Sequence, residues 1–243
     1  MTINKFLLSG IVIAGLVVFV VAANWYRGGE AEKSEQVAAQ GVDRLISAQS
    51  PTLGPPDAVV TVVEFLDPEC EACRAMHPIV KQVLREFDGR IRLVVRYAPF
   101  HQNSGYAVSL LEAARAQNKY WELMDVFFAR QPEWASHQAP RPELLIGYAQ
   151  SLGLDTAQLR DSAADPQIAQ HIRNDVADGA ALGVTRTPTF FVNGRPLLQI
   201  GYEPLRAAVA AALGELEPAP AARLRLGAAC HVEPGLHPVS PAS

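Results

Sequence analysis

The sequence predicts an α/β domain, and the first indication is a strand–helix–strand pattern. Residues 59–65 form a β-branched and aromatic run typical of a buried strand, and residues 70–87 carry apolar positions at helical spacing. After the Asp88-Gly89 turn, residues 91–98 predict a second strand. Because a helix connects the two strands, we expect them to be parallel and the crossover to be right-handed.

The second indication is a hairpin near the end of the predicted domain. Residues 190–192 and 196–200 flank Asn193-Gly194, which is the strongest short-range hairpin signal. A final helix is predicted over residues 204–213. The sequence therefore predicts a hairpin and a closing helix after the strand–helix–strand unit.

The third indication is a run of helical patterns between the second strand and the hairpin. Tyr120, Trp121, Met124, Phe127 and Phe128 are spaced for packing in this block rather than for binding a cofactor. We expect helices over residues 104–116, 120–130, 142–152, 156–163 and 166–182. A helical block of about residues 103–182 is therefore inserted into the α/β domain.

Length, composition and charge limit the class of protein. A chain of 243 residues that is 49% hydrophobic can bury one good core. The net charge is only −4 and no basic block occurs, so neither a nucleic-acid surface nor a polybasic membrane patch is indicated. We expect proteins as partners.

The N-terminus carries a membrane or export segment. Residues 6–23 are an uninterrupted run of 18 uncharged, mostly apolar residues, which at about 1.5 Å per residue come close to spanning the hydrocarbon core. An export signal has a shorter apolar region, which favours an anchor, although Val21-Ala22-Ala23 is compatible with signal cleavage. Lys5 is the only side-chain cation before the run, so charge alone orients the segment weakly.

These patterns divide the chain into four parts. We assign residues 1–27 to the anchor or signal segment, 28–56 to a polar linker, and 57–214 to the α/β domain. Residues 215–243 are rich in Pro, Ala and Gly and are expected to be a disordered tail. Cys230 in that tail is expected to be an unpaired, exposed thiol without a role in the chemistry, with cross-linking of a dimer or an added redox step as the alternatives.

The most informative motif is Cys70-Glu71-Ala72-Cys73, at the point where the first strand is followed by the helix. Free backbone N–H groups and the positive end of the helix dipole stabilise an anion there, so Cys70 should ionise more readily than a free cysteine. Cys73, one turn further, can resolve a mixed disulfide formed at Cys70. The motif predicts thiol–disulfide exchange, in an oxidising compartment outside the cytoplasm.

Other interpretations of the two cysteines are a metal site and a structural disulfide. Zinc usually needs four ligands, and no second C-x-x-C or H-x3-H occurs. An inert disulfide between cysteines so close together closes too small a loop to stabilise much. Cys70, Cys73 and His77 fall on one helix face, so a copper-binding chaperone remains an alternative of a different class.

A wider set of residues resembles the DsbA-like branch of the thioredoxin superfamily. The resemblance rests on Glu64 six residues before Cys70, the C-x-x-C motif, the run Thr-Pro-Thr-Phe-Phe-Val-Asn-Gly at residues 187–194, and the helical block. It covers about residues 57–214 and is strongest to membrane-anchored or secreted bacterial disulfide oxidoreductases. It implies a thioredoxin fold with a helical insertion and no bound cofactor.

The resemblance also implies a role for each site residue. Cys70 is the nucleophile, Cys73 the resolving thiol, and Thr187-Pro188 a cis peptide bond facing them, so that the backbone of Thr187 can pair with an extended substrate. Glu64 is implied to be a buried acid whose raised pKa lets it exchange a proton with Cys73. The alternative for Glu64 is an exposed position at a sheet edge.

The predicted function is therefore disulfide formation on protein substrates that contain cysteines. As the resemblance implies, a membrane quinone-linked partner reoxidises the pair. We expect a single-pass protein of the bacterial inner membrane with its catalytic domain in the periplasm, or a soluble periplasmic protein after signal cleavage. A disulfide reductase or isomerase is the alternative within the class.

The sequence departs from the pattern of strong oxidants, which usually carry Pro-His between the cysteines. Here Glu71-Ala72 stands in that place, and Asp67, Glu69 and Glu71 outnumber Arg74 around Cys70. We expect this negative charge to disfavour the Cys70 thiolate and to move the couple toward reducing. Arg186 could offset it, whereas His101 is expected to be a surface histidine without a catalytic role.

Overall fold

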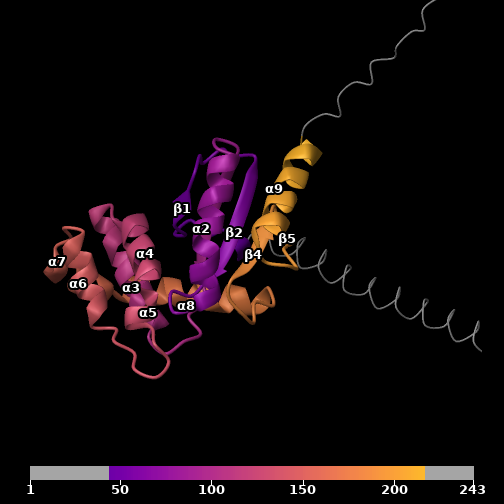
Figure 1. The fold of residues 1–243 in the computed structure, drawn as a ribbon. Coiled ribbons are helices and arrows are strands. Elements are labelled where there is room, and N and C mark those ends of the chain that lie inside the picture. The colour runs from indigo at the N-terminus through magenta and orange to yellow at the C-terminus, as the bar shows by residue number, and fades with distance from the viewer. Residues whose placement is uncertain (1–43, 217–243) are drawn as a thin grey trace, which may run out of the picture.

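The centre of the structure is a five-stranded mixed sheet, in a computed structural model that describes residues 44–216 (Figure 1). The strand order is β1-β3-β2-β4-β5. The strands are β1 (Thr52–Leu53), β2 (Val60–Leu66), β3 (Ile91–Tyr97), β4 (Thr189–Val192) and β5 (Arg195–Pro196). The predicted N-terminal segment and Cys230 lie outside the described residues, and within those residues no helix is long and apolar enough to cross a membrane.

The predicted strand–helix–strand unit is confirmed. Strands β2 and β3 are parallel, with Val60 opposite Ile91 and Leu66 opposite Tyr97, and helix α2 (Glu71–Glu86) connects them. The carboxyl ends of both strands therefore lie at the same edge of the sheet, next to the N-terminus of α2. This edge carries the site.

The predicted hairpin is also confirmed, with a shorter second strand. Asn193 and Gly194 both have positive φ (45° and 82°), as a two-residue turn with the twist of the flanking strands requires. Strand β5 ends at Pro196 rather than continuing to residue 200. Proline has no N–H to donate to a ladder, so it is confined to the edge of a sheet.

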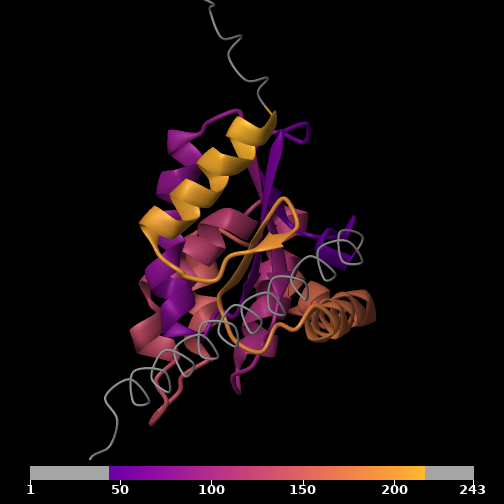
Figure 2. The same cartoon turned by 90° about the vertical axis from the view of Figure 1, so that its right-hand side faces the viewer.

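The helical block between β3 and β4 is confirmed with modified boundaries. It leads from β3 back to the sheet, and Figure 2 shows it from a second side. Helix α3 ends two residues early because residues 115–117 tighten into a 3-10 turn and Asn118 has φ 54°. The helices are α3 (Ser104–Ala114), α4 (Tyr120–Ala129), α5 (Gln131–Trp134), α6 (Leu144–Ser151), α7 (Thr156–Ala163) and α8 (Pro166–Ala181).

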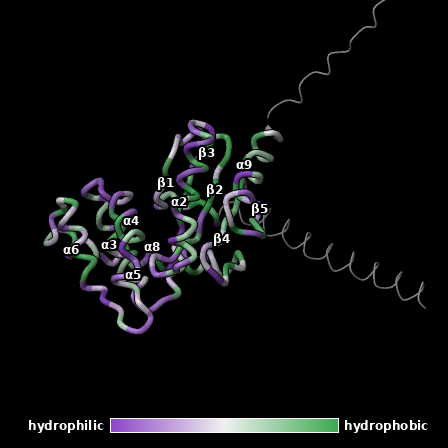
Figure 3. The backbone as a smooth tube through the Cα atoms, in the orientation of Figure 1, coloured by the Kyte–Doolittle hydropathy of each residue, from purple (hydrophilic) through white to green (hydrophobic). Residues whose placement is uncertain are grey.

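Strand β2 alternates between two cores, as the period of a strand requires. Val62 and Leu66 pack in the larger core with α2 and with α9 (Tyr202–Leu216), and Val63 and Phe65 pack in the smaller core on the other face. Figure 3 shows how this strand and its neighbours run through the middle of the folded domain. Glu64 shares the parity of Val62, so its side chain is directed to the α2 face.

Helix α8 covers the opposite face through a buried ion-pair cluster. Arg96 Nε lies 2.8 Å from Asp175 Oδ1, and Arg96 Nη2 lies 2.7 Å from Asp178 Oδ2. Gly179 allows the close approach, since a Cβ there would lie 3.1 Å from the Phe65 ring. The side chains of Arg96 and Asp175 are fully buried, so this cluster links α8 of the helical block to β3 of the sheet through buried ion pairs.

The sheet begins earlier in the chain than residue 57, which corrects the predicted linker 28–56. Thr52 and Leu53 form β1, antiparallel to Val94 and Leu93 of β3, and Leu45 is only 2% exposed in the smaller core. A two-residue strand is too short to give a periodic signal, and the prolines on both sides of it indicate turns or loops rather than a strand.

Candidate active site

The two cysteines lie at the N-terminus of α2, as predicted. Cys70 is the N-cap residue, and its N–H donates to the Asp67 carbonyl oxygen at 3.1 Å. Both cysteines are free thiols in the structure. Cys70 is 8% exposed whereas Cys73 is fully buried, so Cys70 is the sulfur that a second molecule can reach.

The pKa of the Cys70 thiol is lowered to about 5, first by the hydrogen bond from Cys73. Burial opposes the shift, while the Thr187 side chain and the backbone N–H groups of Ala72 and Cys73 add to it. The expectation that neighbouring acidic residues would disfavour the thiolate is therefore wrong. Hydrogen bonds at a helix N-terminus dominate, because they act at contact distance.

The pKa of Cys73 moves in the opposite direction. Burial raises it most, and the hydrogen bond to Cys70 and the charge of Glu64 raise it further. The Asp67 N–H points at Cys73 Sγ at 3.5 Å. The site thus holds one sulfur ready to be a thiolate and one that stays protonated.

Glu64 is a buried acid, 3% exposed, on the face of β2 that α2 covers. Its pKa is raised to about 8 by burial and, to a smaller extent, by the charge of Cys70. The side chain lines a cavity of about 30 Å³ together with Lys81 and Asp125. That is room for about one water molecule.

Thr187 and Pro188 bring the last third of the chain against Cys70. The peptide bond between them is cis, and the Thr187 carbonyl oxygen lies 3.3 Å from Cys70 Sγ. They also line a cavity of about 630 Å³, together with Arg186 and Leu198. Leu198 is 81% exposed and Arg186 is exposed at the rim.

His77 does not complete a metal site with the cysteines. Its Nε2 lies 2.6 Å from Asp125 Oδ1, and its ring packs 4.9 Å from the Phe128 ring of α4. Lys81 Nζ binds the same carboxylate at 2.6 Å. Within residues 44–216 no three His, Cys, Asp or Glu side chains are grouped to hold a metal.

Asp67 and Glu69 face the loop between β3 and α3 rather than opposing the thiolate. The Asp67 carboxylate accepts hydrogen bonds from the N–H groups of Phe100 at 2.7 Å and His101 at 3.1 Å, and from the Ser104 hydroxyl. Glu69 accepts from the Asn103 amide at 2.9 Å and from the Ser104 hydroxyl at 3.0 Å. Both acids therefore order a loop beside the cysteines.

The structure brings His101, which was expected to be a surface histidine, against the buried Asp67 beside the cysteines. Its Nδ1 lies 2.7 Å from Asp67 Oδ2, and its side chain is 32% exposed. The signal was available: Asp67 and His101 each follow one of two parallel strands, and the carboxyl ends of such strands meet at one edge, where α/β proteins bind ligands.

Glu71 lies outside this cluster of buried groups. Its side chain is 55% exposed and pairs with His137 of the α5–α6 loop, Oε1 to Nε2 at 2.9 Å. An exposed, paired carboxylate is well screened by solvent. Its place between the cysteines in the sequence therefore suggested a larger effect on the Cys70 pKa than its exposed side chain can have.

A family model described as thioredoxin matches residues 47–211 of the chain. The chain belongs to the thioredoxin family. The Silicibacter pomeroyi thioredoxin-like oxidoreductase structure is 30% identical, with a TM-score of 0.63 over 71% of this chain and 98% of that one. BdbD from Bacillus subtilis, at 24% identity, covers 68% of this chain and 94% of its own with a TM-score of 0.62. The thiol-disulfide exchange protein alpha-DsbA2 from Wolbachia pipientis, at 23%, covers 78% and 98% with a TM-score of 0.65.

The last two likenesses show the fold alone, and this fold is the predicted thioredoxin fold with a helical insertion. The family match and the structure at 30% identity make this chain a thioredoxin-family protein that is similar to a thioredoxin-like oxidoreductase. The membership of the thioredoxin superfamily inferred from the motifs is thereby confirmed.

Curated relatives match over part of their own length. The chain is 44% identical over 146 residues to a Na(+)/H(+) antiporter NhaA 1 of Salinispora arenicola, covering 58% of this chain and 21% of the relative. It is 35% identical over 185 residues to a Na(+)/H(+) antiporter NhaA of Herminiimonas arsenicoxydans, covering 76% and 28%. This thioredoxin-family chain thus spans less than a third of the relatives' length.

Proposed function

We propose that the chain catalyses thiol–disulfide exchange on protein substrates through Cys70 and Cys73, in the direction of disulfide formation. The opposite pKa shifts of the two thiols carry the proposal. A low pKa makes Cys70 a stable thiolate and a good leaving group, whereas a high pKa makes Cys73 a poor one. Such a split favours the reduced form of the pair, and a couple whose reduced form is stabilised is an oxidant.

The first step opens the active-site disulfide. A substrate thiolate attacks Sγ of Cys70 in the Cys70–Cys73 disulfide, the bond between the two cysteines breaks, and its electron pair leaves on Cys73. The Cys73 thiolate is buried and strongly basic, so it takes a proton from Glu64, whose pKa of about 8 leaves it protonated at neutral pH.

The second step releases the product. A second thiolate of the substrate attacks the substrate sulfur of the mixed disulfide, and Cys70 leaves as a thiolate. The substrate loses two electrons and two protons, and the Cys70–Cys73 pair gains the two electrons. The low pKa of Cys70 speeds this step, because a thiol of lower pKa leaves faster.

The cavity next to the cis peptide bond gives the substrate a place to lie. It begins at Thr187, whose carbonyl oxygen is 3.3 Å from Cys70 Sγ, and continues along Leu197 and Leu198. Backbone pairing to an extended segment is tolerant of sequence, and the apolar wall accepts a range of side chains. This suits unfolded proteins that contain cysteines.

The setting that we propose is the bacterial inner membrane, with the N-terminal segment as a single-pass anchor and the domain in the periplasm. The alternative is a soluble periplasmic protein after signal cleavage. The apolar run of residues 6–23 and the persistence of disulfides in oxidising compartments support this setting. We further propose a membrane quinone-linked partner that removes the two electrons from the reduced pair.

Two single substitutions in the full-length chain test the exchange reaction. With an excess of a peptide dimer, joined by a disulfide between single cysteines, as the probe, the Cys70 thiolate of Cys73→Ser is expected to attack that disulfide, release one peptide as a thiol and keep the other in a mixed disulfide, because no Cys73 thiol is present to resolve it. Cys70→Ser is expected to form none and to lose exchange by at least about a thousandfold, the usual scale for loss of a nucleophile. A mixed disulfide mapped by mass spectrometry to Cys73 would show that the roles are reversed.

A further inference from the structure

We propose that His101 tunes Cys70: its imidazolium, held in place by Asp67, stabilises the Cys70 thiolate across the mouth of the site. His101 is a positioning residue in this proposal, since it acts on substrate through Cys70. The inference deepens the proposed function, on which it rests, and it assigns to the β3–α3 loop a task that the Glu71-Ala72 pair between the cysteines does not perform.

Asp67 connects His101 to both cysteines. Its side chain accepts a hydrogen bond from His101 Nδ1 at 2.7 Å, while its carbonyl oxygen accepts from the Cys70 N–H at 3.1 Å and its own N–H faces Cys73 Sγ at 3.5 Å. Asp67 is fully buried. A histidine bound to this residue is therefore fixed relative to the sulfurs.

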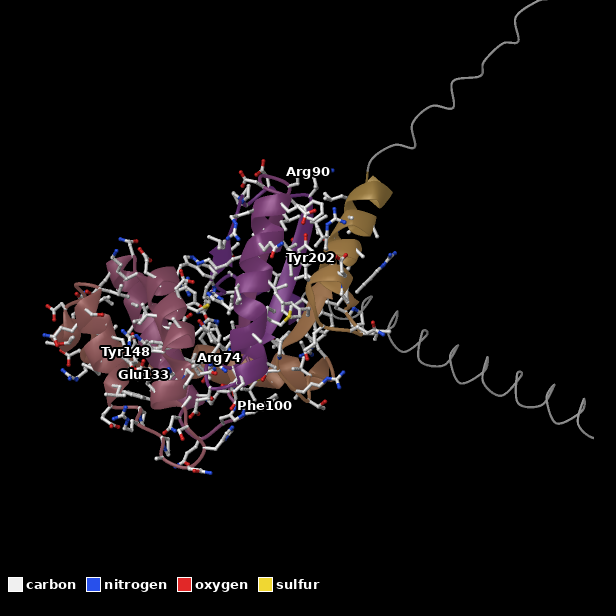
Figure 4. All side chains as sticks on the ribbon, in the orientation of Figure 1. Arg74, Arg90, Phe100, Glu133, Tyr148 and Tyr202 are labelled. Atoms are coloured by element: carbon white, nitrogen blue, oxygen red, sulfur yellow. The ribbon has the colours of Figure 1, made fainter. Side chains whose placement is uncertain are left out.

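The loop that carries His101 is held at several points. Asp67 accepts from the backbone N–H groups of Phe100 and His101, and Ser104 donates its hydroxyl to Asp67 and Glu69. Figure 4 labels Phe100, the neighbour of His101, near the end of α2 that also carries Arg74. The imidazole is thus held in one preferred position, and little conformational entropy is lost when it stabilises the thiolate.

The groups that face His101 come from three segments, which are the β2–α2 connection, the first turn of α2 and the α5–α6 loop, and are mostly anionic. Its ring centroid lies 6.1 Å from that of His137, whose Nε2 binds Glu71 at 2.9 Å. His137 is 66% exposed and therefore well solvated. The charged groups within reach are Asp67, Glu69, Cys70, Glu71 and His137.

The balance of these groups favours the imidazolium. Burial, the largest single cause, lowers the pKa of His101, but the hydrogen bond and charge of Asp67 and the charges of Cys70 and Glu69 together raise it above its ordinary value. The pKa of Cys70 is about 5, so thiolate and imidazolium coexist from about pH 5 up to the pKa of His101. Above that pH the thiolate loses its counter-ion.

Coupling between two sites is reciprocal, which gives a test on the unaltered protein. The titration of histidine ring signals is followed by NMR in the full-length chain in detergent, once with the Cys70–Cys73 disulfide and once after reduction, and the His101 signal is assigned by its loss in His101→Gln. The pKa of His101 should be about 0.5 to 1 unit higher in the reduced protein, because only that form carries the thiolate. A difference below about 0.2 unit overturns the proposal.

The substitution gives the other half of the coupling. The pH dependence of Cys70 alkylation by iodoacetamide, read by peptide mass spectrometry to separate it from Cys73 and Cys230, should shift upward by the same about 0.5 to 1 unit in His101→Gln. His137→Gln, which removes the exposed neighbour, should leave it within about 0.2 unit. Equal shifts in both variants, or none in His101→Gln, would assign the effect to general charge and reject His101. Because alkylation needs no substrate disulfide, failure of exchange itself would be seen separately, in the trapping experiment with Cys73→Ser.

Discussion

At the scale of single residues, the site depends on which side of a helix N-terminus each sulfur occupies. Cys70 caps α2 and meets unpaired N–H groups, whereas Cys73 faces the core and Glu64. The same element therefore lowers one pKa and raises the other. The sequence already indicated the first half of this through the C-x-x-C position.

The buried carboxyl of Glu64 makes stability depend on pH. Its pKa is raised from 4.5 to about 8, so between these values the folded reduced protein binds one proton more than the unfolded chain. Stability must then fall as pH rises through this window. The full shift of about 3.5 units corresponds to about 5 kcal/mol.

Glu64→Gln removes this titration. We expect the variant to gain stability over the natural protein as pH rises from about 5 to about 8, by several kcal/mol at the upper end. Urea denaturation of the reduced proteins at a series of pH values measures the gain. Glu122→Gln, on the exposed face of α4, is the matched control and should show a flat difference. A pH-independent difference for Glu64→Gln would mean that the acid is ionised in the fold.

Charge counting along the sequence failed around Cys70, for a physical reason. Asp67, Glu69 and Glu71 are near Cys70 in the chain. Asp67 and Glu69, however, accept hydrogen bonds from the β3–α3 loop, and the Glu71 side chain is exposed to solvent. Which partner a carboxylate meets is a matter of tertiary structure. His101 was undervalued for the same reason.

At the scale of elements, the parallel strands, the hairpin and the long helices followed from periodicity and turn residues. Periodicity could not predict short elements, such as β1 and α5, or contacts between elements that are distant in the sequence. The buried cluster of Arg96 with Asp175 and Asp178 is of the second kind. Its partners lie about 80 positions apart, and no local pattern pairs them.

This cluster predicts a large effect of removing its cation. Arg96→Met removes the guanidinium from the buried Asp175 and leaves it the longer contact with His171 Nε2 at 3.5 Å, and breaking a buried pair in this way destabilises by about 3–5 kcal/mol. Arg96→Met with Asp175→Leu should recover part of the loss, which thermal or urea unfolding of the single and double variants measures. Additive losses would show that the two side chains act independently.

At the scale of the whole molecule, the thioredoxin-family domain is preceded by residues that lie outside the described range. The proposed anchor predicts that the full-length chain, expressed in a Gram-negative bacterium, is recovered in membranes after an alkaline carbonate wash and released by detergent. A variant lacking residues 2–27 should remain soluble. A mature protein that begins after Ala23 by mass spectrometry, and that is released without detergent, would instead establish signal cleavage.

The direction of electron flow is the central claim, and the reduction potential of the Cys70–Cys73 pair tests it most directly. Equilibration of the full-length chain in glutathione buffers, with the pair quantified by alkylation and mass spectrometry, gives the value. A Cys70 pKa of about 5 stabilises the reduced form, while the absence of a histidine between the cysteines limits the effect. We predict a potential between about −120 and −200 mV, in the range of disulfide-forming proteins. A value near about −270 mV or below, as in thioredoxin, would contradict the account and make the chain a reductase.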